Sequence, residues 1–218
     1  MLGHDGGMAG SDRPYHHGHL APALVGAAVE RARRAGPDAV VVREVARDVG
    51  VSPSAAYRHF RDRDDLLSAV AQVAREELAA HLLEAIGRAP GSGDRRADAL
   101  ARLEACGRGY VHFARSASPL FRTAFTATRA PARPDEPDAA AILVGCLDDL
   151  VDVGLLDPDR RRDAAVIAWS VTHGLGSLLA DGAIAALWRI PDDEALDAVI
   201  VAVRRALLGP DIGPAGPA

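Results

Sequence analysis

Apolar residues recur every three or four positions along most of the chain, which is the spacing of one face of an α-helix. Runs in which apolar and polar residues alternate, as they do in half-buried strands, are nearly absent. Aromatic residues, which strands favour, make up only 4% of the sequence, and alanine is abundant. The pattern therefore predicts an all-α fold.

Glycine, proline and capping residues divide the N-terminal part into four predicted helices. Gly50 permits the left-handed conformation that often ends a helix, whereas Ser52 followed by Pro53 is typical of a helix start. Asp62 and Asp65 have the spacing of a capping box. These signals predict helices over residues 20–34, 42–50, 53–60 and 63–87.

The rest of the chain carries the same helical period. After a loop over 89–94, helices are expected over 95–114, 119–127, 139–156, 158–181 and 193–208. A loop is expected over 128–138, and the chain ends in a Gly/Pro-rich tail. No apolar run approaches the ~20 residues that span a bilayer, and the N-terminus lacks the pattern of a secretion signal. These features predict a cytoplasmic protein.

The charged residues are distributed unevenly along the chain. Residues 1–63 hold nine arginines against seven acidic residues, whereas the remainder holds sixteen arginines against twenty-three, and the net charge of the whole chain is −5. A neutral-to-basic first part on an acidic body suits a protein in which only the first part meets an anionic polymer, such as a nucleic acid.

The segment from Arg43 to Phe60, REVARDVGVSPSAAYRHF, predicts two short helices joined by a tight turn. Its apolar residues can close a small core, and the small Ala46 lets the two helices cross closely. Ser54, Tyr57 and Arg58 then lie together on the opposite face of the second helix, at the i, i+3, i+4 spacing. A helix-turn-helix presents its second helix to the DNA major groove in this way.

The residue types of this segment fit contacts with double-stranded DNA. An arginine such as Arg58 can donate two hydrogen bonds to guanine, a serine such as Ser54 can bond to several bases, and the ring of Tyr57 can lie against a sugar or a thymine methyl group. Arg43 and Arg63, near two helix starts, would bracket the site with phosphate-binding charge. The candidate DNA-binding residues are Arg43, Ser52, Pro53, Ser54, Tyr57, Arg58, His59 and Arg63.

The stretch from Val42 to Leu67, with the helix before it and the long helix that follows, resembles the TetR family of transcriptional regulators. The resemblance is carried by the Tyr-x-His-Phe sequence that begins at Tyr57, a basic residue at Arg63 and a leucine at Leu66. In this family the basic residue is more usually a lysine, and the position of Ala56 more often holds a larger apolar residue. The resemblance implies a homodimer whose N-terminal domains bind palindromic operators and whose divergent C-terminal domains sense a small molecule.

The C-terminal half also resembles one branch of the same family. Trp169, His173 and Gly174 match a Trp-x3-His-Gly (WHG) signature, and the segments PYHHGHL and FARSASPLFRTAF are similar to that branch too. A ligand pocket is then expected between the long fourth helix and the helices after it. The candidate ligand-binding residues are Phe113, Phe121, Phe125, Trp169 and His173, although ordinary core packing is the favoured interpretation for each of these side chains.

The last two long helices suggest how a dimer could form. Leu196, Val199, Ile200, Val203 and Leu207 make an apolar stripe on the last helix, and the helix before it combines large apolar residues with glycines and a serine. Two such helices from each subunit would make a four-helix bundle across a two-fold axis. Alternatively, both stripes face the core of a single subunit.

The sequence lacks the familiar patterns of hydrolytic and phosphate-binding sites, so neither catalytic residues nor a cofactor are expected. Cys106 and Cys146 match neither a metal spacing nor a disulfide framework, which favours reduced packing cysteines. The sequence around His16, His17 and His19 does not show the carboxylate or cysteine spacing that would complete a metal site. A flexible arm that touches phosphates or the minor groove is therefore favoured over a metal site.

The sequence as a whole predicts a homodimeric, ligand-responsive transcriptional regulator, which we expect to be a repressor. Residues 15–63 would form the helix-turn-helix DNA-binding domain, and residues 64–208 the C-terminal effector-binding and dimerisation domain. The expected partners are a double-stranded DNA operator, a small-molecule effector and a second copy of the chain, with no membrane. Two alternatives stay open: a helical small-molecule-binding protein or enzyme that keeps the N-terminal module as a scaffold, and an activator or co-regulator.

Overall fold

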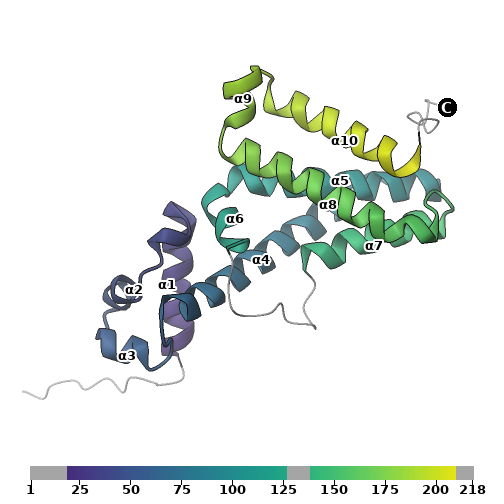
Figure 1. The fold of residues 1–218 in the computed structure, drawn as a ribbon. Helices are drawn as coiled ribbons and strands as arrows, with labels where there is room; N and C mark the ends of the chain where they lie inside the picture. Colours follow the sequence, from purple (N-terminus) through teal and green to yellow (C-terminus); the bar gives the residue numbers. More distant parts are fainter. Residues whose placement is uncertain (1–18, 127–137, 210–218) are drawn as a thin grey trace, which may run out of the picture.

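The computed structural model describes residues 19–126 and 138–209, and the regular elements in these ranges are all helices (Figure 1). The prediction of an all-α fold is confirmed. The N-terminal arm with His16 and His17, nearly all of the loop expected over 128–138, and the C-terminal tail lie outside the described residues. Within the described ranges, none of the helices has the length and apolarity that crossing a membrane requires.

The first elements of the chain form a small lobe. They are α1 (Leu20–Ala35), the 3-10 helix η1 (Pro37–Ala39), α2 (Val42–Val49) and α3 (Pro53–Tyr57). Leu24 and Ala28 of α1, Val45 and Ala46 of α2 and Ala56 of α3 are almost inaccessible to solvent and belong to one apolar core. Because three of these five residues are alanines, the helices can approach one another closely.

The turn between α2 and α3 follows the capping signals in the sequence. Gly50 ends α2 in the left-handed conformation, with φ of 76°. The Ser52 side chain accepts a hydrogen bond from the backbone N–H of Ala55 at 3.2 Å, and Pro53 occupies the first helical position. The turn therefore needs no long-range contact to define where one helix stops and the next begins.

The α3 helix ends at Tyr57, earlier than the expected end near Phe60. Asp62 has an extended backbone, and its side chain caps the next helix by accepting a hydrogen bond from Asp65 N at 2.8 Å. In return, the Asp65 side chain accepts one from the backbone N–H of Arg61 at 3.1 Å. Since the chain must leave the helical conformation before the extended cap, α3 is cut short.

The larger body is a bundle of helices. In chain order they are α5 (Arg95–Ser116), α6 (Ser118–Ala124), α7 (Ala139–Asp152), the 3-10 helix η2 (Pro158–Arg160), α8 (Arg161–Ala180), α9 (Ala183–Trp188) and α10 (Asp192–Leu208). The central α5 packs against α7, α8 and α10 (Figure 1). The short α6 packs against α5 on one side and against α1 and η1 of the lobe on the other.

The long α4 (Arg63–Gly87) joins the lobe to the body and has the predicted bounds (Figure 1). It contacts α1 in the lobe and α5, α6 and α7 in the body. Buried residues recur along it from Leu66 to Leu82. The lobe and the body are therefore connected by one continuous helix and, beside it, by the contacts of α6.

The C-terminal elements differ from the prediction in two respects. The sequence did not indicate α9, because its six residues are too few to display a helical period. It is bounded by Gly182 and Arg189, which are both left-handed. The α7 helix ends at Asp152 rather than near residue 156, since Gly154 turns the chain with φ of 67°.

The apolar stripe on α10 faces the interior of its own subunit. Leu196, Ile200, Val203 and Leu207 are buried, and Val199 is half-buried against the same cores. The stripe packs on α5 and α8. These four residues therefore belong to the core of a single subunit, which was the alternative to the four-helix bundle between subunits. They are not available to pair with a second copy.

Candidate nucleic-acid interface and effector cavity

The side chains predicted to meet DNA are exposed on and around α3. Ser54, Tyr57 and Arg58 are all exposed, and Tyr57 leaves 42% of its surface open to solvent. His59, directly after α3, and Arg43, in the first turn of α2, are exposed as well. The lobe thus offers hydroxyl, phenol, imidazole and guanidinium groups to solvent, which are the groups that proteins use on bases and phosphates.

Ser52 and Pro53 are exposed at the start of α3. The Ser52 hydroxyl accepts the capping hydrogen bond described above and also lies 3.0 Å from the Ser54 hydroxyl. Both serines are therefore held in a local network at the beginning of the exposed helix.

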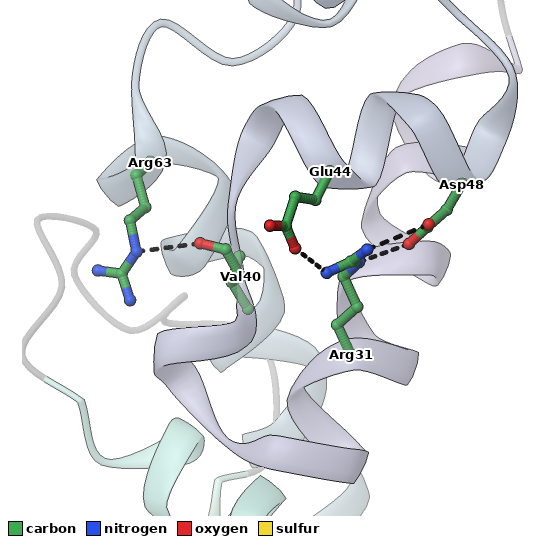
Figure 2. Close-up of polar contacts among 5 residues, drawn as sticks. All are labelled: Arg31, Val40, Glu44, Asp48 and Arg63. Carbon is green, nitrogen blue, oxygen red and sulfur yellow. Dashed lines mark hydrogen bonds and ion pairs between the residues drawn. The ribbon is translucent and has the colours of Figure 1, made fainter.

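Arg31 of α1 holds α2 in place. Figure 2 shows its guanidinium between Glu44 and Asp48, which lie one turn apart on α2. Nη2 of Arg31 donates to Asp48 Oδ1 at 3.1 Å, and Nη1 donates to the Glu44 carboxylate. The hydrogen bond from Arg31 lowers the pKa of Asp48, and the same bond raises the pKa of Arg31. This clamp sets the position of α2 and, through the tight turn, that of α3.

Arg63, a candidate phosphate-binding residue, donates hydrogen bonds to backbone carbonyls of the lobe. Its Nε donates to the carbonyl oxygen of Val40 at 3.0 Å (Figure 2), and its Nη2 donates to the carbonyl oxygen of Pro37 at 2.7 Å. The Asp38 carboxylate lies 3.5 Å from the same nitrogen. The arginine thereby ties the start of α4 to the connection between α1 and α2. Its contact with a phosphate stays a prediction.

Five ring-bearing side chains of the body form one cluster. They are Tyr110 of α5, Phe121 of α6, Phe125 directly after α6, and Trp169 and His173 of α8. The Tyr110 ring is 5.5 Å from Trp169 and 5.7 Å from Phe121 between centroids, and both pairs meet edge to face. Such pairs stabilise a core beyond the area that they bury. The cluster therefore joins α5, α6 and α8.

A hydrogen bond connects two members of this cluster. The Tyr110 hydroxyl and Nδ1 of His173 are 2.7 Å apart. Burial raises the pKa of Tyr110 well above its usual range, so the phenol keeps its proton. Burial lowers the pKa of His173, which favours the neutral imidazole. In the neutral tautomer that carries its proton on Nε2, the hydroxyl donates and Nδ1 accepts.

A narrow apolar cavity lies beside the cluster. Helices α4, α5, α7, α8 and α10 all contribute to its wall, and its main apolar residues are Leu82, Leu100, Leu103, Leu143, Ile200 and Val203. Trp169 and Tyr110 close one side, and Glu104 and Arg204 supply the charged groups of the wall. The cavity volume is about 40 Å³, far below the roughly 300–1,000 Å³ typical of ligand pockets. A ligand of ordinary size would need the helices to separate.

Of the five candidate ligand-binding residues, Trp169 lines this cavity. Phe121, Phe125 and His173 lie behind Trp169 and Tyr110, in the aromatic cluster. Phe113 is buried elsewhere, with its ring centroid 5.8 Å from that of His81. The cavity lies between α4, which contributes Leu82, and the later helices α5, α7, α8 and α10, which is the region where the sequence suggested a ligand pocket.

Several residues that shape these sites carried no local signal. Arg31, Glu104 and Arg204 each act through a partner that is 13 to 100 positions away in the sequence. Tyr110 is central to the cluster, yet its neighbours in the sequence resemble those of any amphipathic helix. Helical spacing identifies the face of one helix and says nothing about which other helix lies opposite.

The positions of the two cysteines agree with the expected packing roles. Cys106 and Cys146 are free and buried. Contact with Cys146, together with burial, raises the pKa of Cys106, so that this thiol stays protonated. In the part of the chain that the structure describes, no three His, Cys, Asp or Glu residues are grouped so that they could hold a metal ion.

Two protein-family models match the chain. The model described as bacterial regulatory proteins, tetR family, matches residues 24–70, which include α2, α3 and most of α1. The model described as tetracyclin repressor-like, C-terminal domain, matches residues 103–203. Together the two matches cover the lobe with its exposed helix and most of the body with its cavity. No curated protein sequence matches the chain.

Solved structures resemble the chain over nearly its whole length. A protein of unknown function from Rhodococcus sp. RHA1 is 29% identical, with a TM-score of 0.68, and the match covers 90% of this chain and 100% of that one. A TetR family transcription regulator from Marinobacter aquaeolei VT8 is 20% identical, with a TM-score of 0.61, over 86% of this chain and 94% of that one.

A variant of TetR from Acinetobacter baumannii AYE, solved in complex with minocycline, is 18% identical, with a TM-score of 0.56. The match covers 91% of this chain and 99% of that one. At 18 and 20% identity, the similarity to the regulators from Acinetobacter and Marinobacter shows the fold alone.

Proposed function

Because this chain belongs to the TetR family of transcriptional regulators, we propose that it is a homodimeric repressor that a small molecule releases from a palindromic operator. Family membership makes it a DNA-binding, helix-turn-helix regulator with a ligand-binding C-terminal domain, and not an enzyme. The repressor mode, the dimer and the identity of the contact residues belong to the proposal. As a DNA-bound regulator it would act in the cytoplasm.

The observation that carries the proposal is the exposed set of side chains on α3. Tyr57 and Arg58 are solvent-exposed on a helix whose position Arg31 secures through α2. A fixed backbone with exposed polar and aromatic groups is what recognition in the major groove requires. The proposed DNA-binding residues are Arg43, Ser52, Pro53, Ser54, Tyr57, Arg58, His59 and Arg63.

The proposed dimer uses the outer faces of α8 and α10. Ile167, Val171 and Leu178 are exposed apolar residues of α8, at spacings of four and seven positions, and therefore share one side of the helix. Val201 is the exposed large apolar residue of α10. A two-fold pairing of these faces would bury them and place two α3 helices on one DNA duplex.

We assign residues 15–63 to the DNA-binding domain and residues 64–208 to the effector-binding and dimerisation domain. Within the family, we place the chain in the branch with the Trp-x3-His-Gly signature. The parallel rings of Trp169 and His173, 6.4 Å apart between centroids, support a shared structural role for these two signature residues. The proposed ligand-binding residues remain Phe113, Phe121, Phe125, Trp169 and His173, of which Trp169 lines the cavity.

The proposed mechanism couples the cavity to the lobe through α4 and α6. An effector that opens the cavity must displace Trp169, which packs against Tyr110 and Phe125. α6 carries Phe121 of the same cluster and contacts α1, and Arg75 of α4 donates to the carbonyl oxygen of Ala124 at 3.1 Å. Movement of α6 and tilting of α4 would change the spacing of the two α3 helices.

Release from the operator requires a coupling free energy between effector binding and operator binding. A 100-fold loss of operator affinity requires about 2.7 kcal/mol of coupling free energy between effector and operator. An effector supplies this amount only through its different affinities for the two arrangements of the helices.

The proposal is tested by titrating the purified protein onto a duplex that carries its own upstream intergenic region, at two salt concentrations. We expect specific binding that weakens with salt, because phosphate contacts release counterions. Tyr57→Ala combined with Arg58→Ala should abolish the specific binding, whereas Leu83→Ala, an exposed position on α4, should not change it.

Absence of specific binding on this or any other genomic duplex, from a folded dimer, would reject the regulator and favour a helical ligand-binding protein with a vestigial lobe. A second outcome concerns the sign of regulation. If the protein binds its operator, and a reporter gene under that operator loses expression when the protein is deleted, the protein is an activator and not a repressor.

A further inference from the structure

An apolar groove lies outside the cavity, in the seam between α7 and α8, which pack side by side (Figure 1). The groove has a volume of about 320 Å³. Its lining includes Ala140 and Val144 of α7 and Val166 and Ser170 of α8. Leu143 of α7 and Trp169 of α8 line both the groove and the cavity. One layer of side chains therefore separates the two spaces at this place.

The seam between α7 and α8 is fixed at one end and apolar further along. At the fixed end the short connection through η2 joins the two helices, and both Nε and Nη2 of Arg161 donate to the carboxylate of Asp148. Leu143 and Trp169 lie one to two helical turns beyond this ion pair. A separation of α7 from α8 that pivots on the fixed end therefore displaces Leu143 and Trp169 and joins the groove to the cavity.

The joined space has the size of an ordinary ligand site. The cavity alone measures about 40 Å³ and the groove about 320 Å³, so that together they reach the lower end of the roughly 300–1,000 Å³ typical of ligand pockets. The joined space is elongated, because the groove and the cavity lie on opposite sides of the layer formed by Leu143 and Trp169.

The walls of both spaces favour an uncharged ligand. The described residues that line the groove include no charged side chain. In the cavity, the charged groups of Glu104 and Arg204 are bonded to each other at 3.2 Å, so neither requires a charge on the ligand. A charged ligand would lose its hydration without gaining an opposite charge in return. A neutral polar group differs, because the hydroxyls of Ser170 and Thr172 are able to bond to it.

The groove lies on a different side of α8 from the face that we propose for the dimer. Val166 and Ser170 of the groove directly precede Ile167 and Val171 of the dimer face. Successive residues of an α-helix point about 100° apart around its axis. Pairing of the two subunits through the dimer face therefore leaves the mouth of the groove accessible to a small molecule.

We propose that the effector is an uncharged, elongated, apolar molecule that enters between α7 and α8, displaces Trp169 and fills the groove together with the cavity. This inference rests on the proposed effector-binding function of the body, and it names the chemical class of the ligand and its path. Displacement of Trp169 breaks its ring contacts with Tyr110 of α5 and with Phe125, which directly follows α6. Entry of the ligand is thereby felt at α6.

The test uses the two tryptophans of the chain. Trp169 lines the site, and Trp188 is 60% exposed, so Trp188→Phe leaves one reporter. In this background, octanol, octanoate, octylamine and butanol are titrated while Trp169 fluorescence is measured, and calorimetry gives the number of molecules bound per chain.

We expect one octanol per chain, with an affinity at least about 10-fold above those of octanoate and octylamine, because both charged probes must lose hydration. Each buried methylene adds about fourfold in affinity, so butanol should bind at least about 100-fold more weakly than octanol. The fluorescence of Trp169 should change in step with octanol binding, since the ring leaves its contacts with Tyr110 and Phe125.

Two neighbouring alanines of α7 provide a matched pair of variants. Ala140 and Ala141 are both exposed, and of the two it is Ala140 that lines the groove. Ala140→Phe fills the groove and should weaken octanol binding at least about 10-fold, the equivalent of about two buried methylenes. Ala141→Phe should leave octanol binding unchanged. Thermal unfolding shows whether each variant is folded.

Val166→Glu is a second, independent variant, at a groove position that is 61% exposed. It places a carboxylate in the groove and should reverse the preference, so that octylamine binds more tightly than octanol. An unchanged preference in this variant would overturn the inference.

Three other results would also overturn it: octanoate or octylamine binding the unsubstituted groove as tightly as octanol, equal octanol binding in the two alanine variants, or the absence of saturable octanol binding. The operator titration is independent of these results. Operator binding without octanol binding removes the uncharged ligand alone, whereas octanol binding by a folded dimer that binds no operator removes the regulator.

Discussion

At the scale of single residues, the arginines of the lobe divide into two groups that the sequence does not distinguish. Arg31 and Arg63 donate to carboxylates and carbonyl oxygens within the lobe, whereas Arg43 and Arg58 are exposed to solvent. The first group positions the recognition helix, and we infer that the second meets DNA. Substitutions in either group are expected to weaken operator binding, in the first group through the fold and in the second through lost DNA contacts.

Substitution of Arg63 should weaken operator binding through the fold. Arg63→Gln loses hydrogen bonds to two backbone carbonyls and is expected to lower the free energy of unfolding by about 1–2 kcal/mol, a fall in Tm of roughly 3–6 °C. Arg58→Gln should leave Tm within about 1 °C and weaken operator binding by about 1–3 kcal/mol. Thermal unfolding and operator titration of both variants check this, and an unchanged Tm in Arg63→Gln would contradict it.

The two histidines with lowered pKa predict a loss of stability in acid. Burial lowers the pKa of His173, and burial with the charge of His112 lowers that of His81. A histidine that is harder to protonate when folded contributes stability above its unfolded pKa of about 6.5, and this contribution is lost as the pH falls below that value. The Tm should therefore decrease between pH 7.5 and 5.5.

The variant that checks the pH dependence is His173→Asn, whose side-chain oxygen can still accept the Tyr110 hydroxyl. It should be less stable than the natural protein at pH 7.5, because ring contacts are lost, yet its Tm should change less with pH. His81→Asn should remove the other part of the slope. An undiminished slope in the double variant would show that other groups cause it.

At the scale of helices, one glycine sets the distance between α4 and α5. A Cβ atom at Gly109 of α5 would lie 2.8 Å from the Cβ of Ala85 and 3.5 Å from Cδ2 of Leu82, both on α4. Neither the backbone nor the alanine can move away without shifting a helix. The α4 helix, which links the cavity to the lobe, and α5 therefore approach as closely as their backbones allow.

Gly109→Ala is expected to destabilise the protein by about 1–3 kcal/mol, the usual range for overpacking a core. The matched control is Gly145→Ala on α7, where no atom lies within 4 Å of the new Cβ. This control should stabilise the protein by up to about 1 kcal/mol, since alanine favours helices over glycine. Thermal or urea unfolding measures both, and equal stabilities of the two variants would contradict the close packing of α4 and α5.

The α10 helix was predicted correctly, but the prediction that its apolar stripe pairs with a second subunit was not. Its apolar period predicted both its existence and its bounds within a residue. The period could not show whether the apolar side packs against another helix of the same subunit or against one from a second copy. Either partner would bury apolar residues at the same helical spacing. The packing against α5 and α8 decides for the same subunit.

At the scale of the whole molecule, the exposed apolar side of α8 is the surface that we propose for pairing with a second copy. Ile167, Val171 and Leu178 are 37 to 41% exposed, although each would gain from burial. A recognition helix as short as α3 makes few contacts, so a pair of them on one duplex is needed for tight binding. Dimer formation and operator affinity should therefore depend on the same side chains.

Leu178→Arg is expected to give a folded monomer at micromolar concentration and to weaken operator binding by at least about 10-fold. Its matched control is Leu83→Arg, at an exposed leucine of α4, which should leave both properties unchanged. Light scattering after size-exclusion chromatography measures the mass, and operator titration measures the affinity. A Leu178→Arg protein that remains a dimer would show that another surface joins the subunits.

The amino-acid sequence by itself determined the longer helices, the caps around α3 and α4, and the helix-turn-helix with its exposed Ser54, Tyr57 and Arg58, because these depend on residues within about one turn of each other. Tertiary structure alone decided that Arg31 holds α2, that α10 packs inward, and that residues of α4, α5, α7, α8 and α10 line one narrow cavity. Each of these depends on groups that are brought together from distant positions, up to 100 residues apart for Glu104 and Arg204. Helical periodicity defines an apolar face, but only packing selects what that face meets.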